Sequence, residues 1–123
     1  MIRLTPQTEA EQRMQIHGDK ALVAKVRRFR PNIVVRSMRA VPFEEDEWLG
    51  GVLTFGEADD APAVTATMRD VRCAMVNFDP NGGSPAPEVL KAVVRANQNN
   101  AGIYGTATRI GRLAVGQTIV LHR

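Results

Sequence analysis

The chain has 123 residues, of which 44% are hydrophobic and 24% charged, and a formal net charge of +3. A chain of this length and composition folds as one globular domain without long disordered stretches. A single cysteine excludes an internal disulfide, and no apolar stretch reaches the length of a signal-peptide core or a membrane span. We therefore expect a cytoplasmic protein that makes no membrane contact.

The positive charge is carried almost entirely by arginine. Of the 16 basic residues only three are lysines, namely Lys20, Lys25 and Lys91. The planar guanidinium binds phosphate and carboxylate groups with two parallel hydrogen bonds, whereas lysine acts as a point charge. The composition suggests an anionic partner, but a general bias toward arginine explains it equally well.

Patterns along the chain predict a strand-rich fold that begins with a short helix. The sequence "TEAE" at residues 8–11 fits a capping box, because a threonine is followed three residues later by a glutamate. It predicts a helix over residues 8–16. The β-branched run "NIVV" and the later alternation in "VTATM" are typical of strands. The first four strands are expected near residues 32–36, 51–56, 64–68 and 72–78.

A second helix is predicted over residues 86–97, after the turn sequence "DPNGG". Ser84 is placed to cap this helix, and Pro85 and Pro87 suit its first turn. Together the elements predict an α+β fold that is mainly β, a small irregular β-barrel with two peripheral helices. The last two strands of this barrel are expected near residues 103–108 and 118–122.

Cys73 is the only cysteine; it follows Arg72 and precedes a run that alternates like a strand. A neighbouring guanidinium favours the thiolate form, which attacks electrophiles and binds soft metals. A free cysteine is also a small hydrophobic side chain that is often simply buried. The residues alone leave both interpretations open.

Most standard site chemistries find no support in the sequence. A zinc site needs three or four ligands, and beside one cysteine the chain has two histidines at opposite ends, His17 and His122. It has neither a dinucleotide-binding glycine fingerprint nor a P-loop. The basic segment "KVRRFR" at residues 25–30 suits nucleic acid, but such runs are most often solvated surface. Nucleic acid is therefore not the favoured partner.

Four segments of the sequence resemble the MOSC domain, the C-terminal domain of molybdenum-cofactor sulfurases. The domain also occurs in the mitochondrial amidoxime-reducing component and in related bacterial proteins. The segments are "RRFRPNIVV", "PFEEDEW", "VRCAMVNFDPNGG" and "GIYGTATRIGRLAVG", in the family's order and at about its spacing. The resemblance implies a single MOSC-like domain over residues 1–123, truncated on its N-terminal side, with a pyruvate-kinase-barrel-like fold.

The resemblance also assigns roles to individual residues. In the reductase branch, the cysteine of the arginine–cysteine pair binds molybdenum through sulfur, which makes Cys73 the metal ligand and the catalytic residue. The resemblance places six further residues in the cradle of the molybdenum cofactor (molybdopterin): Arg28, Arg30, Asn32, Asp46, Arg72 and Tyr104. It implies that Arg72 contacts the phosphate or pyran side of the pterin and that Asp46 pairs with a cradle arginine. A soft thiolate suits molybdenum, and arginines suit a phosphate.

Two features depart from the family pattern. Val71 stands where cofactor-binding members have a small polar residue. The chain also starts too late to contain the β-rich part that completes the family's pocket. An incomplete pocket implies that the cofactor is absent, or that it binds only with a partner chain. It also implies exposed edge strands, which a homo-oligomer or another partner would cover.

Three functions remain open at this stage. The first is a cofactor-binding MOSC protein that carries sulfur or reduces N-hydroxylated or other oxidised small molecules. As a reductase it needs an external electron donor, because one cysteine cannot hold an iron–sulfur cluster. The second is a non-catalytic MOSC remnant that serves as a subunit or partner. The third is a basic β-domain that binds nucleic acid or another anion. At the family level the resemblance also carries an association with pyridoxal phosphate, and it leaves open whether this chain is an oxidoreductase, a sulfurtransferase or not an enzyme.

Overall fold

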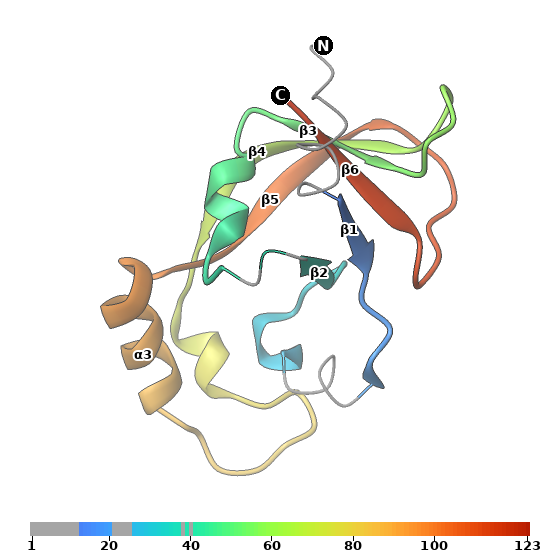
Figure 1. Cartoon of the computed structure of the whole chain (residues 1–123). Helices are drawn as coiled ribbons and strands as arrows, with labels where there is room; N and C mark the ends of the chain where they lie inside the picture. The colour runs from blue at the N-terminus through green and yellow to red at the C-terminus, as the bar shows by residue number, and fades with distance from the viewer. Residues whose placement is uncertain (1–12, 21–25, 38, 40) are drawn as a thin grey trace.

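The computed structural model of the chain describes residues 13–20, 26–37, 39 and 41–123, and this part is mainly β (Figure 1). The strands are β1 (Arg13–Ile16), β2 (Val35–Ser37), β3 (Val52–Phe55), β4 (Ala63–Val71), β5 (Asn100–Arg109) and β6 (Thr118–His122). The helical elements that lie wholly within the described residues are three 3₁₀ helices and one α-helix: η1 (Arg27–Phe29), η2 (Glu44–Trp48), η3 (Ala74–Asn77) and α3 (Glu88–Asn97).

The six strands form one antiparallel sheet in the order β2-β1-β6-β3-β4-β5, curved into a half-barrel (Figure 1). Its longest strands are β4 and β5, whose pairing contains three shifts of register. Such shifts bend the strands and increase their twist. Among the described residues β2 and β5 are the two edges of the sheet, so the half-barrel is open between them.

The centre of the sheet carries the core. Leu53 of β3 lies opposite Leu121 of β6, and Phe55 lies opposite Ile119. All four side chains are buried, two of them completely. Residues two apart on a strand point to the same side, so these two strands present a continuous apolar surface. Burying one side chain of this size contributes about 1.5–3 kcal/mol.

The prediction of a mainly β fold is confirmed. The four strands expected near residues 51–56, 64–68, 103–108 and 118–122 correspond to β3, β4, β5 and β6, of which β4 and β5 are longer than expected. The strand expected near residues 32–36 overlaps β2 only at its end, because β2 begins at Val35.

The helix predicted over residues 86–97 is confirmed as α3, but Ser84 does not cap it. The helix begins at Glu88, with Pro87 in the N-cap position and no side-chain cap from that residue. Instead, Oδ1 of Asn77 accepts a 2.9 Å hydrogen bond from the N–H of Leu90. An acceptor from η3 thus satisfies one of the free N–H groups at the start of the helix.

The helix predicted over residues 8–16 is wrong in its second half. Residues 13–16 form β1, while residues 8–12 lie outside the described part of the chain. β1 pairs with β2 on one side and β6 on the other, and Met14 is 2% exposed in the core. The sheet offers this segment two partners and a place in the core, which outweighs a local capping signal.

The strand predicted over residues 72–78 is also wrong. β4 ends at Val71, and after two extended residues Ala74–Asn77 forms η3, whose turn is closed by the N–H of Val76 and the carbonyl of Cys73. Val76 is the one buried residue of η3. The alternation that suggested a strand therefore reflects a single core contact.

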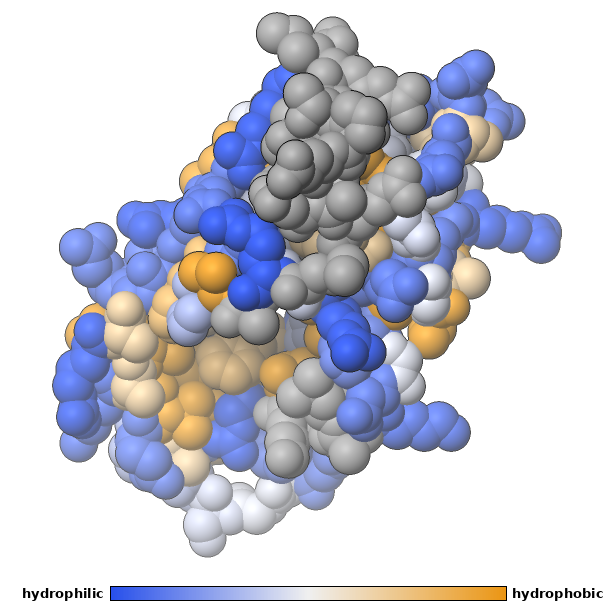
Figure 2. Space-filling model, in the orientation of Figure 1, coloured by the Kyte–Doolittle hydropathy of each residue, from blue (hydrophilic) through white to orange (hydrophobic). Residues whose placement is uncertain are grey.

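The helical elements gather at one end of the half-barrel. α3 contacts η3 and β5, η1 contacts η3, and η2 packs on β5. In Figure 2, apolar surface gathers in the lower part of the viewed face, over the region where Figure 1 shows α3 and the neighbouring turns. None of the helices in the described residues is both long and apolar enough to cross a membrane.

Candidate functional site

The side chain of Arg72, just after β4, ties three parts of the chain together. Its Nε donates a hydrogen bond to the carbonyl oxygen of Ala101 in β5, and its Nη1 donates one to that of Phe29 in η1, both 2.7 Å long. Its Nη2 lies 3.0 Å from Oδ2 of Asp70, and the side chain is 14% exposed. The guanidinium also lies 5.2 Å from the centre of the Phe29 ring, where cation–π attraction acts. Arg72 is therefore a clamp between β4, β5 and η1.

Neighbouring backbone groups hold the same point. The N–H of Arg72 donates to the carbonyl of Asn99, and the carbonyl of Arg72 accepts from Nδ2 of Asn99, both at 2.8 Å. Gly102 has φ +87°, and a Cβ there would lie 3.0 Å from Nη2 of Arg72. Glycine tolerates this left-handed backbone, so β5 can pass close to the clamp. The N–H of Gly102 donates to Oε1 of Glu45 at 3.0 Å, which adds η2 to the same junction.

Cys73 follows the clamp directly and is exposed. Its backbone is extended, with φ −122° and ψ −179°, and it occupies the N-cap position of η3. The interpretation of Cys73 as a buried core residue is therefore wrong. In the described residues no group of three or more histidine, cysteine, aspartate or glutamate side chains could hold a metal ion. Cys73 thus offers an accessible soft ligand, not a complete protein-built metal site.

The "RFRPN" segment places two of its three candidates at a cavity. Arg30 and Asn32 line a space of about 470 Å³ together with Arg27, whereas Arg28 does not line it. Arg30 has φ 51°, and its Nη1 donates to the carbonyl oxygens of Arg28 at 3.2 Å and Met75 at 3.4 Å. Arg30 therefore connects η1 with η3 at the edge of a cavity that carries positive charge.

Asp46 makes two contacts near the end of β4. Its Oδ2 lies 3.5 Å from Nη1 of Arg69 and accepts a 2.7 Å hydrogen bond from Nδ2 of Asn97 in α3. The resemblance implied that Asp46 pairs with a cradle arginine, and Arg69 is not one of them. The other carboxylate oxygen, Oδ1, is buried without a hydrogen-bond partner among the described residues. Asp46 joins η2, β4 and α3 beside the clamp.

Tyr104 lies on β5 and is 55% exposed. It is opposite Met68 in the register of β4 and β5, and Met68 is similarly exposed. The neighbouring Ile103 packs on the core, so Tyr104 points to the other face of the sheet. The structure therefore places Tyr104 on the outer face of β5, apart from the junction made by Arg72.

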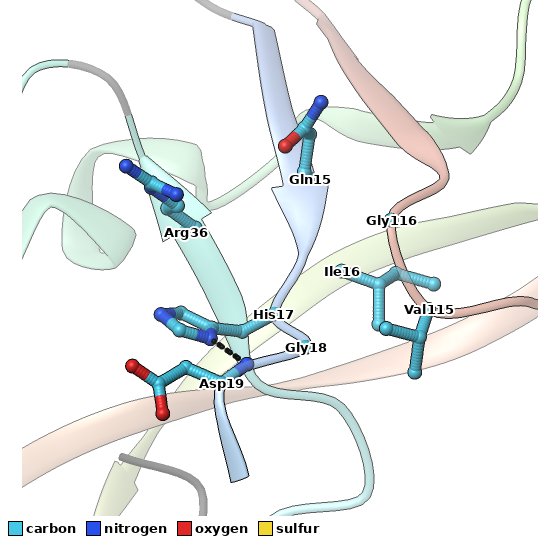
Figure 3. A pocket seen from close by; sticks show the side chains of 8 residues that line it. All are labelled: Gln15, Ile16, His17, Gly18, Asp19, Arg36, Val115 and Gly116. Carbon is cyan, nitrogen blue, oxygen red and sulfur yellow. Dashed lines mark hydrogen bonds between the residues drawn. The ribbon is translucent and has the colours of Figure 1, made fainter. Parts of the chain in front are cut away.

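The two histidines are in different places. Nε2 of His122 lies 2.9 Å from the hydroxyl of Thr54 in the sheet. Nδ1 of His17 accepts a hydrogen bond from the backbone N–H of Asp19 at the rim of a second cavity of about 500 Å³ (Figure 3). Arg36 also lines this second cavity, and His17 borders both cavities.

The four sequence segments that resembled one family meet at this junction. Arg72 of the third segment bonds to Phe29 in the first and to Ala101, which precedes the fourth. Glu45 of the second segment bonds to Gly102 in the fourth. Segments that are far apart in the chain thus surround the point from which Cys73 emerges.

Several residues of the junction were not identified from the sequence. Asp70 had one local signal, its negative charge two residues before Arg72. Asn99 and Glu45 were assigned no role in the site from the sequence. Phe29 and Ala101 each accept a hydrogen bond through a backbone carbonyl. Every residue type has such a carbonyl, so the sequence does not reveal these two contacts.

Fold and site together define a small half-barrel domain that presents an arginine-flanked cysteine at the end of a strand. The chain belongs to the MOSC domain family, whose model matches residues 4–120. Neither the curated proteins nor the solved structures contain a match to this chain.

Proposed function

We propose that this MOSC-domain chain binds a molybdenum cofactor through the thiol of Cys73. The observation that carries the proposal is the exposure of this thiol at the junction of the four family segments. A junction that only stabilised the fold would not need to place its one thiol at the surface.

The residues present fit such a ligand. A thiolate is a soft ligand of the kind that molybdenum–sulfur centres take. Arg27, Arg30 and Asn32 line a cavity large enough for a phosphate and part of a ring system. Guanidinium groups and an amide donate hydrogen bonds to phosphate oxygens, so this cavity suits the anionic end of the cofactor.

Arg72 takes the role of a positioning residue in this proposal. Each of its three nitrogens already has a partner within the chain, which leaves two of its five N–H donors without one. Its side chain fixes the direction in which β4 ends and therefore where Cys73 lies. The resemblance assigned the phosphate contact to Arg72. In this proposal Arg30 and Arg27 make that contact instead.

When bound, the molybdenum centre would supply two-electron redox or sulfur-transfer chemistry. In both cases the contribution of the chain begins with Cys73 as a sulfur ligand. The reduction of N-hydroxylated or other oxidised small molecules would take its electrons from an external donor. Sulfur carriage would need no such donor.

Loading the purified chain with molybdenum cofactor released from a donor enzyme tests the proposal. After removal of free cofactor, metal analysis by mass spectrometry should find molybdenum on the wild type and essentially none on Cys73→Ser. Met75→Leu is a matched control, because it removes a nearby exposed sulfur that is not a thiol, and it should keep the wild-type content. Equal molybdenum content in wild type and Cys73→Ser would overturn the proposal.

A further inference from the structure

Among the described residues, no strand pairs with the outer edge of β5. At its start, Arg72 bonds to the carbonyl of Ala101 and Glu45 to the N–H of Gly102. Beyond this point residues 104–109 are all exposed, and residues 104–108 contain neither a charge nor a proline. Proteins usually protect long edge strands with such residues. The other edge, β2, has only three residues.

The direction of the backbone groups on this edge follows from the hydrogen bonds of β4. The N–H of Ala66 donates to Gly51 at 3.0 Å, and its carbonyl accepts from Gly50 at 2.9 Å, so both groups face β3. The backbone groups of the preceding residue, Thr65, therefore face β5. Thr65 lies opposite Thr106, which must turn its own N–H and C=O toward β4.

On both sides of Thr106, the backbone alternates. Gly105 and Ala107 therefore direct their N–H and C=O groups away from the sheet. The Tyr104 carbonyl accepts a hydrogen bond from the Thr67 hydroxyl of β4, as this alternation requires. Among the described residues nothing bonds to the outward groups of Gly105 and Ala107.

We propose that a second copy of this chain pairs with this edge, β5 against β5, as an antiparallel two-fold dimer. On each strand the outward N–H and C=O groups belong to alternate residues, and in the dimer they bond only to the outward groups of the other copy. A two-fold axis that matches these alternate residues must pass through a residue and not between two residues. The midpoint of the uncharged stretch is Thr106. With the axis there, Gly105 pairs with Ala107 of the second copy, and the reverse, which gives four backbone hydrogen bonds.

The residues of this stretch suit a second copy in this register. Each copy carries +3, yet the paired stretch brings no charged residues together. Arg109 of one copy lies six residue positions from Arg109 of the other, or about 20 Å. Thr106 of one copy faces Thr106 of the other across the axis, and pairs of threonines on neighbouring strands are favourable. A pairing of about five residues buries less than the roughly 800 Å² per partner of a stable complex. The dimer should therefore be weak and depend on concentration.

Disulfide cross-linking tests the register. In a Cys73→Ser background, Thr106→Cys should form a covalent dimer under mild oxidation, because residues that face each other in a non-hydrogen-bonded pair have Cα atoms about 4.5 Å apart. Thr108→Cys is the matched control on the same strand. Its two copies would lie about 13 Å apart and should not cross-link. Cross-linking of Thr108→Cys in place of Thr106→Cys would overturn the register.

Sedimentation measures the dimer without a cross-link. The wild type should shift from monomer toward dimer as its concentration rises about a hundredfold. Thr106→Lys puts two like charges across the axis and should weaken the dimer about five- to tenfold. Thr65→Lys adds the same charge one strand inward and should leave it unchanged. Ala107→Pro removes only an outward N–H, so it should keep the wild-type circular dichroism and lose the dimer.

The outcomes divide clearly. A wild type that stays monomeric throughout, or a dimer that Thr106→Lys and Ala107→Pro leave intact, would overturn the proposal. The proposal is independent of cofactor binding, because none of its variants except the Cys73→Ser background touches the junction at Arg72.

Discussion

The guanidinium of Arg72 donates a 2.7 Å hydrogen bond to the carbonyl of Phe29, 43 residues earlier in the chain. The same side chain bonds to Ala101, 29 residues later. Three distant parts of the chain thus depend on one side chain, and the residue next to it is the exposed cysteine. The position of Cys73 is therefore set by tertiary contacts of its neighbour.

Replacing Arg72 by alanine should destabilise the protein by about 2–4 kcal/mol, because it leaves Asp70 and two carbonyl groups without their partner. Urea unfolding measures the loss. Arg36→Ala is the control, since Arg36 is exposed and has no described ion pair, and it should change stability by less than about 0.5 kcal/mol. Equal effects of the two substitutions would contradict the clamp.

Gly102→Ala should destabilise the chain more than Gly82→Ala does. Both glycines have positive φ, +87° and +98°, so both substitutions cost about 1 kcal/mol of backbone strain. At Gly102 the added methyl also meets the Arg72 guanidinium at 3.0 Å, whereas at Gly82 nothing lies within 4 Å. Thermal midpoints of the two variants compare them directly. A larger loss at Gly82 would show that β5 does not need to approach the clamp closely.

Asn77→Ala should lower stability by about 1 kcal/mol, the usual loss for a helix cap. Its Oδ1 accepts from the N–H of Leu90 in the first turn of α3. Asn81→Ala, in the exposed turn before the helix, should have almost no effect on the free energy of unfolding. The contact between η3 and α3 would be unimportant if the two variants unfolded at the same urea concentration.

Cys73→Ser should leave the stability of the fold within about 0.5 kcal/mol of the wild type, because the side chain is exposed. The native thiol should react with an aromatic disulfide reagent about as fast as the thiol of the urea-unfolded chain, and Arg72→Ala should keep this reactivity. A slowly reacting native thiol, together with a clearly less stable serine variant, would place Cys73 in the core.

The later strands of the sheet were predicted better from the sequence than the first strand, β1, and the turn η3. β6 was predicted with its observed bounds, because a short run of β-branched and apolar residues after a turn is typical of a buried strand. β1 was missed, because its place between β2 and β6 comes from partners far along the chain. η3 was missed, because alternating apolar residues look the same in a strand and in a 3₁₀ turn with one buried residue.

At the candidate site, the resemblance supplied the residues and the structure supplied their relationships. Arg72 was expected to contact a ligand, and the structure shows it bound mainly to its own chain. Sequence patterns could not reveal this, because two of its partners are backbone carbonyls on other elements. Asp46 was expected to pair with a cradle arginine, but the arginine that it contacts is Arg69, which the resemblance did not place in the cradle.

X-ray absorption at the molybdenum edge of the cofactor-loaded chain is the sharpest test of Cys73 as a metal ligand, because it counts the sulfur atoms bound to the metal. If Cys73 binds the metal, the wild type should have one more molybdenum–sulfur bond than the small amount of cofactor that Cys73→Ser retains. Met75→Leu should give the wild-type spectrum. Identical sulfur coordination in the wild type and Cys73→Ser would contradict the assignment of Cys73 as the ligand.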